Sequence, residues 1–139
     1  DVNKKQGRTP QLQTPNFLGN FSLSYTFSKI GINIDYTGNV TSPMNLPVVP
    51  NDYRPEQSPW FTIQNIQVSK KLTNGFEFYG GVKNVLNFTP SDPILRPFDP
   101  FDKHITENNP NNYTFDPSYN YAPMQGRRFF IGIRYNLYN

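Results

Sequence analysis

The sequence predicts an all-β fold of five antiparallel strands. Five segments alternate apolar and polar side chains, which is the pattern of a strand with one apolar and one polar face. All 14 prolines lie outside these segments, and proline cannot donate a hydrogen bond to a β-ladder. No segment has the 3.6-residue period of an amphipathic helix. The predicted strands are residues 17–27, 30–40, 60–72, 76–87 and 127–138.

The first two strands form the clearest hairpin. Residues 17–27 (FLGNFSLSYTF) place phenylalanine, leucine and tyrosine on one face and mostly serine, threonine and asparagine on the other. Residues 30–40 repeat this alternation with isoleucine and tyrosine on the apolar face. Only residues 28–29 separate the two segments, a connection of hairpin length.

The third and fourth strands form a second hairpin. Residues 60–72 (WFTIQNIQVSKKL) have a blurred pattern, because Lys70 shares the face of Ile66 and Val68. Residues 73–75 (TNG) are a strong turn signal. Residues 76–87 (FEFYGGVKNVLN) then alternate again.

The last predicted strand, residues 127–138, has the sharpest contrast between its faces. Arg134 and Asn136 belong to the polar face. The apolar face consists of Phe129, Ile131, Ile133, Tyr135 and Leu137.

Composition narrows the class of protein. The mean hydropathy of −0.67 excludes a helical membrane protein, but it permits a membrane β-barrel, whose strands need an apolar residue only at every second position. With no cysteine, disulfides, thiol catalysis and cysteine-ligated zinc are excluded. The net charge of +3 is compatible with a nucleic-acid or anionic-surface partner but does not indicate one.

The connections alternate in length. Residues 28–29 and 73–75 are short, whereas 41–59 and 88–125 are long and rich in proline. In an up-and-down meander, alternate connections emerge at the same end, so both short turns share one rim. Outer-membrane barrels have short periplasmic turns and long extracellular loops. The sequence therefore predicts a segment of a transmembrane β-barrel with lipid outside and water inside.

Aromatic residues are predicted to mark both ends of the barrel wall, as interfacial girdles do. The girdle predicted near the short turns is Tyr25, Phe27, Phe76, Phe78, Tyr135 and Tyr138. The girdle predicted near the long loops is Trp60, Phe61, Phe88, Phe129 and Phe130. Because about eight strands are the fewest that close a membrane barrel, we expect the missing strands to come from another part of the polypeptide or from another chain.

The order of these features resembles the C-terminal end of TonB-dependent outer-membrane transporters, especially those of Bacteroidetes-type bacteria. The resemblance covers about residues 8–139. The segments that carry it are GRTPQLQTPNF into SLSYTF, FTIQNIQVSKKL, FEFYGGVKNVLN and GRRFFIGIRYNLYN. GVKNVLN is similar to the motif of the penultimate strand in that family, and the ending is similar to its final strand.

The resemblance implies a barrel of roughly 22 strands, with an N-terminal plug domain and a TonB box that are not in this sequence. It implies active import of a scarce solute (a siderophore, haem, cobalamin or an oligosaccharide) across the bacterial outer membrane. The implied partners are the rest of the receptor, the lipid bilayer, TonB through the missing N-terminal region, the barrel-assembly machinery and a surface-exposed substrate-binding lipoprotein. The last strand would carry the assembly signal, with the C-terminus periplasmic.

The candidate ligand-binding residues are aromatic side chains of the long loops, which offer flat faces for stacking on a ligand. They are Tyr53, Trp60, Phe98, Phe101, Tyr113, Phe115, Tyr119 and Tyr121. The alternative is that these side chains pack the loops onto themselves. His104 lies near Asp99, Asp102 and Glu107, but a solvated loop explains this group, so no metal and no cofactor are expected.

The sequence does not support catalysis or nucleic-acid binding. No nucleophile–base pair or phosphate loop is present, so we expect no enzyme activity. The run GRRFFIGIRY resembles an RNA-binding strand, but that module requires helices, and no nucleic-acid partner is expected. A soluble all-β carbohydrate- or ligand-binding module remains the alternative, and it requires a second sheet over the apolar faces.

Overall fold

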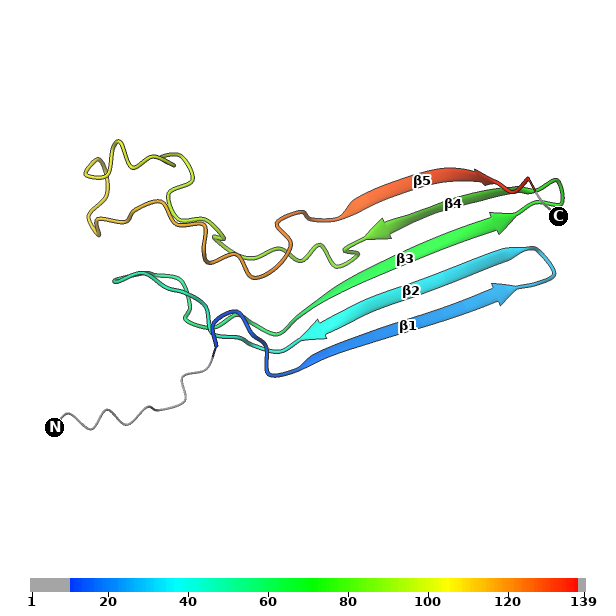
Figure 1. Cartoon of the computed structure of the whole chain (residues 1–139), viewed down its shortest axis with the longest axis horizontal. Helices are drawn as coiled ribbons and strands as arrows, with labels where there is room; N and C mark the ends of the chain where they lie inside the picture. The colour runs from blue at the N-terminus through cyan, green and yellow to red at the C-terminus, as the bar shows by residue number, and fades with distance from the viewer. Residues whose placement is uncertain (1–10, 138–139) are drawn as a thin grey trace.

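The structure is a computed structural model that describes residues 11–137, and it contains one antiparallel sheet with strand order β1-β2-β3-β4-β5 (Figure 1). The strands are β1 (Leu18–Phe27), β2 (Ile32–Thr41), β3 (Phe61–Lys71), β4 (Phe76–Lys83) and β5 (Arg128–Tyr135). Both short turns lie at one end of the sheet and both long connections at the other (Figure 1). The predicted all-β, up-and-down arrangement of five strands is therefore confirmed.

Several strand boundaries differ from the prediction by one residue, and three differ by two to four residues. The first turn covers residues 28–31 instead of 28–29, because Gly31 has a φ of 65° that L-residues rarely adopt. β4 ends at Lys83 instead of residue 87, since Asn84 and Asn87 both have positive φ. β5 ends at Tyr135, so Leu137 follows the strand.

Strand register gathers the apolar positions of all five strands on one face. Tyr25 lies opposite Ile34, which lies opposite Val68, and the same row continues through Gly80 to Ile131. Most large side chains of this face on β1, β4 and β5 are exposed, with Ile131 at 88%, whereas those on β2 are partly buried. The apolar faces predicted for the individual strands therefore form one apolar face of the sheet.

The girdle predicted near the short turns lies on this apolar face, except that Tyr138 is outside the described residues. Tyr25 contacts Phe27 and Phe76 contacts Tyr135, each pair with ring centroids 4.7 Å apart. The girdle predicted near the long loops is only partly right. Trp60 and Phe129 belong to the apolar face, and Trp60 lies 6.3 Å from Phe17.

Three of the predicted girdle residues lie elsewhere. Phe61 and Phe88 stack at a centroid distance of 4.9 Å, and Phe61 is buried. Phe130 pairs with Gly81 and so lies on the polar face of the sheet. The prediction is wrong for Phe61 and Phe130 because strand alternation turns them to the side opposite the apolar face, and for Phe88 because it follows the end of β4 and packs on Phe61.

The buried core lies at the loop end of the sheet instead of along its faces. Its members come from β3 and from both long connections, and Ile63, Phe88 and Tyr121 pack around them. The core residues are Met44, Leu46, Phe61, Tyr119 and Ala122.

The sheet is open within the described residues. β1 pairs only with β2, and β5 pairs only with β4, so each has one edge without a partner strand there. Residues 11–137 contain no helix that is long and apolar enough to cross a membrane.

Aromatic rings lie over glycines of neighbouring strands on the polar face. Phe130 covers Gly81, where an added Cβ would be 2.7 Å from its Cζ, and Tyr79 covers Gly132 in the same way. Each glycine thus leaves the space that a ring on the next strand fills, an arrangement that holds strand register in sheets.

We expect Gly81→Ala to destabilise the sheet by about 1–3 kcal/mol, the usual cost of an overpacked position. The new methyl group would collide with the Ile66 carbonyl and with Phe130. Gly80→Ala is the matched control, because a Cβ there meets the Phe130 carbonyl oxygen only at 3.3 Å. Denaturant unfolding of the protein measures both variants, and equal losses would contradict the ring-over-glycine packing.

Candidate ligand-binding surfaces

The two long connections and the segment before β1 fold together as one loop unit, defined as residues 11–17, 42–60 and 84–127. Each connection folds back on itself, with isolated bridges between Asn45 and Gln57 and between Leu95 and Asp116. Gln13 joins all three segments. Its backbone N–H donates to the Asn45 carbonyl (2.8 Å), and its side-chain amide donates to the Ser118 carbonyl (2.7 Å).

Two buried asparagines close turns of the second connection in the same manner. The Asn84 side chain accepts a hydrogen bond from the Phe88 N–H (3.0 Å), and Asn109 accepts one from the Tyr113 N–H (2.9 Å). In both turns the residue three positions later is an asparagine with positive φ. The sequence signal is N-x-x-N-aromatic, which occurs as NVLNF and NPNNY, and the sequence analysis missed it.

A buried charge cluster joins the two connections. The Arg54 side chain donates to both carboxylate oxygens of Asp52 and to Asp116 at 2.9 Å. Arg54 is only 4% exposed. Its guanidinium lies 4.2 Å from the centroid of the Tyr119 ring, and the Tyr119 hydroxyl donates to the Pro55 carbonyl (2.7 Å). This cluster fixes one long connection against the other.

The electrostatics of the cluster favour its charged form. Burial alone would raise the pKa of Asp52, but hydrogen bonds from Arg54 outweigh it and lower that pKa. For Asp116 too, burial opposes ionisation, and hydrogen bonds from Ser118 and Arg54 lower the pKa. Burial raises the pKa of Tyr119, whose ring covers the cluster.

We expect the loop unit to lose stability in acid. Carboxyl groups with lowered pKa stabilise the folded state above their ordinary value of 3.8, and this contribution disappears as the pH falls below 3.8 through the folded pKa values. Hydrogen-exchange protection factors of residues 42–60 should therefore stay constant down to about pH 5 and fall below it. A loss of protection near neutral pH would contradict this expectation.

The structure brings several of the predicted ligand-binding aromatics together. Tyr119 is the most buried of them, at 2% exposure. Tyr121 lies 5.9 Å from Tyr119 and 5.8 Å from Phe61, between ring centroids. Tyr53 is exposed and meets Tyr113 at 6.0 Å, and the Tyr113 hydroxyl donates to the Asn51 carbonyl (2.7 Å).

The remaining predicted aromatics lie apart from this group. Phe98 and Phe101 are 77% and 78% exposed, and each ring has a cation near it, Arg96 at 4.8 Å and Lys103 at 5.6 Å. Phe115 is half-buried, and its N–H donates to Asp102 (2.7 Å). Trp60 is on the apolar side, beside Phe17.

A cleft of about 480 Å³ opens between the two connections. The Arg54 cluster forms part of its wall. The lining residues are Tyr53, Arg54, Pro55, Gln57, Ser58, Pro59, Ser91, Asp92, Tyr119 and Tyr121. Three of the predicted ligand-binding aromatics thus share one cleft, in which aromatic faces alternate with hydroxyl, amide and carboxylate groups.

The histidine segment is a folded turn. The Asp99 carboxylate accepts hydrogen bonds from the N–H groups of Lys103 and His104, each at 2.9 Å. The exposed His104 ring contacts Glu107 at 3.0 Å, and this hydrogen bond raises the pKa of His104. Among the described residues, no group of three or more histidine and acidic side chains is placed to hold a metal ion.

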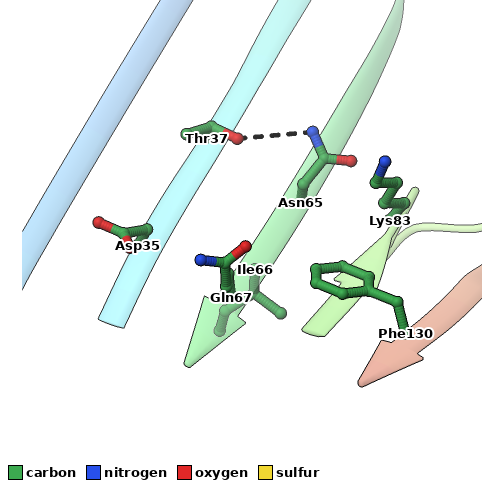
Figure 2. A pocket seen from close by; sticks show the side chains of 7 residues that line it. All are labelled: Asp35, Thr37, Asn65, Ile66, Gln67, Lys83 and Phe130. Atoms are coloured by element: carbon green, nitrogen blue, oxygen red, sulfur yellow. Dashed lines mark hydrogen bonds between the residues drawn. The ribbon is translucent and has the colours of Figure 1, made fainter. Parts of the chain in front are cut away.

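A second hollow, of about 330 Å³, lies on the polar face of the sheet (Figure 2). It spans three neighbouring strands, with Asp35 on β2, Asn65 and Gln67 on β3, and Lys83 on β4. Phe130 of β5 closes one side. The sequence does not indicate this hollow, and it predicts Phe130 only as a girdle residue, because alternation assigns a face but does not show which polar groups lie next to one another.

No family model, curated protein or solved structure matches this chain.

Proposed function

We propose that this chain is the C-terminal part of a TonB-dependent active importer of the bacterial outer membrane. The observation that carries the proposal is a single-layer sheet whose apolar face has no second layer over it and exposes most of its large side chains on β1, β4 and β5, while the opposite face is lined mainly with polar side chains. Large uncovered apolar patches mark surfaces that meet another apolar phase. A bilayer supplies that phase, and a barrel wall is the β-structure that satisfies backbone hydrogen bonds within it.

Two further features support a barrel wall. Exposed aromatic rings lie at both ends of the apolar face, as the interfacial girdles of outer-membrane barrels do. The short turns lie at one end of the sheet and the folded loop unit at the other (Figure 1). The alternative of a soluble binding module requires a second sheet over the apolar face, and the described residues form only one.

Within this proposal the segment has three tasks. β1 to β5 form part of the barrel wall, and their free edges pair with strands from the rest of the receptor. Phe129, Ile131, Ile133 and Tyr135 face lipid and belong to the assembly signal, together with Leu137 beyond the strand. The cleft between the long connections belongs to the extracellular vestibule that a solute enters. No residue has a catalytic task.

Single cysteines test the membrane placement, because these 139 residues contain none. Asn111→Cys places a thiol on an exposed part of the loop unit, and Asn74→Cys places one in a short turn. In intact cells, a membrane-impermeant maleimide should label the full polypeptide at residue 111 and not at residue 74. Permeabilising the outer membrane should make residue 74 reactive.

The unsubstituted polypeptide is the background control for this labelling. Recovery of the polypeptide in the soluble fraction would overturn the membrane placement. Labelling of residue 74 in intact cells, with residue 111 unreactive, would reverse the proposed orientation.

A further inference from the structure

Two cations lie directly opposite each other on the polar face of the sheet. The register of β4 and β5 pairs Lys83 with Arg128, and both side chains are exposed. Like charges at directly opposed positions of a sheet repel and cost stability. Neither side chain forms a salt bridge with another described residue. The strand register therefore places two like charges opposite each other without an acidic partner among the described residues.

The two acidic side chains on the polar face of the five strands, Asp35 and Glu77, have other partners. Glu77 contacts Arg134 at 3.3 Å. Asp35 lines the hollow beside Lys83, but its two carboxylate oxygens accept hydrogen bonds from Ser24 and from the Asn33 amide. Figure 2 shows its carboxylate turned away from Lys83. Among the described residues, neither carboxylate forms an ion pair with Lys83 or Arg128.

The hollow beside the pair combines a cation with a flat apolar wall. The Lys83 ammonium lies 5.7 Å from the centroid of the Phe130 ring. Gln67 presents a side-chain amide on the floor between Lys83 and Asp35 (Figure 2). The hollow of about 330 Å³ is large enough for a small solute. Its chemistry suits an anionic group beside the cations and a planar, unsaturated portion against the ring.

We propose that Lys83, Arg128 and Phe130 form an anion-binding subsite for solutes that carry a carboxylate or phosphate group next to a planar portion. The inference rests on the proposed function, because a solute reaches this face only if it lines a water-filled lumen. It specifies the chemical class of the cargo: a planar organic anion. A bound anion would also neutralise the repulsion between the two cations.

Calorimetric titration of the full polypeptide, purified from outer membranes in detergent, tests the subsite. The probes are benzene-1,3,5-tricarboxylate, the non-planar cyclohexane-1,3,5-tricarboxylate, and inorganic phosphate. The unsubstituted protein should bind the planar tricarboxylate more tightly than the non-planar one. Lys83→Gln and Arg128→Gln should each weaken that binding at least roughly tenfold, the effect of losing a hydrogen bond to a charged group.

Two further variants distinguish binding at the subsite from nonspecific electrostatic attraction of the anionic probes to the protein. Lys71→Gln removes a cation of the same face that lies opposite Glu77, and it should change the affinity less than about twofold. Phe130→Leu should remove the preference for the planar probe while phosphate competition persists. Undetectable binding of the planar probe, or equal losses in Lys71→Gln and Lys83→Gln, would overturn the subsite. Because the protein tested is already recovered from outer membranes, such a failure leaves the proposed membrane function standing.

Discussion

Leu23→Arg is expected to lower the free energy of unfolding of the protein in lipid by about 2–4 kcal/mol, which under the proposed membrane placement is the cost of an arginine near the bilayer midplane. Leu23 is exposed on the apolar face, in the middle of β1. Its neighbour Ser22 pairs with Thr37 on the polar face, so Ser22→Arg should cost little. The two variants place the same charge at nearly the same depth and on opposite faces.

Urea unfolding from lipid vesicles measures the difference in stability, and immunoblots of outer-membrane fractions measure assembly. We expect a reduced amount of Leu23→Arg in the outer membrane and a normal amount of Ser22→Arg. Equal behaviour of the two variants would contradict the assignment of faces. A larger effect of Ser22→Arg would instead indicate that the polar face is the one buried against another structure.

Arg54→Ala is expected to destabilise the loop unit by about 3–5 kcal/mol, because it leaves the Asp52 and Asp116 carboxylates buried without their common partner. The change also removes the cation beside the Tyr119 ring. The sheet itself should remain intact, since Arg54 contacts only residues of the two long connections. The expected result is therefore local opening of residues 42–60 and 84–127.

Hydrogen exchange in the full polypeptide resolves this opening residue by residue. Protection should fall in both long connections and persist in β1 to β4. Arg54→Lys is the matched variant, because it retains the charge and loses the paired hydrogen bonds to Asp52, so its effect should be intermediate. Unchanged protection in Arg54→Ala would show that the core around Phe61 and Leu46 holds the loop unit without the ion pairs.

The faces of the sheet could be predicted because strand alternation is a local property. Each strand turns its side chains by the same rule, so five short patterns determine five faces independently. Even the blurred third strand obeys it. Lys70 lies on the apolar face opposite Ile32 and Phe78, close to the short turns, where a long side chain can carry its charge to the interface.

Strand ends were harder to predict, because side-chain hydrogen bonds decide them. Alternation alone extends the fourth strand to residue 87, but the Asn84 side chain binds the Phe88 backbone and turns the chain. A polar residue that satisfies backbone groups locally competes with the ladder. Here the Asn84 side chain ends the strand, and a pattern of apolar and polar positions does not distinguish this asparagine from any other polar residue.

The environments of the candidate ligand-binding aromatics could not be predicted from the composition of the loops. These residues were selected for their flat faces, and the structure distributes them among a buried core, an open cleft and two exposed positions beside cations. Arg54 and Asp116, which hold the cleft together, are 62 residues apart. No local pattern connects charges at such a separation.

By itself, the sequence determined the fold class, the strand order along the chain and the two-sided character of each strand, since these depend on neighbouring residues. Tertiary structure alone decided which polar groups share a surface: Arg54 with Asp52 and Asp116 in the loop unit, and Lys83 beside Arg128 on the polar face. The physical reason is that electrostatic and hydrogen-bond contacts depend on distances in space, which strand register and loop closure set only after the chain has folded.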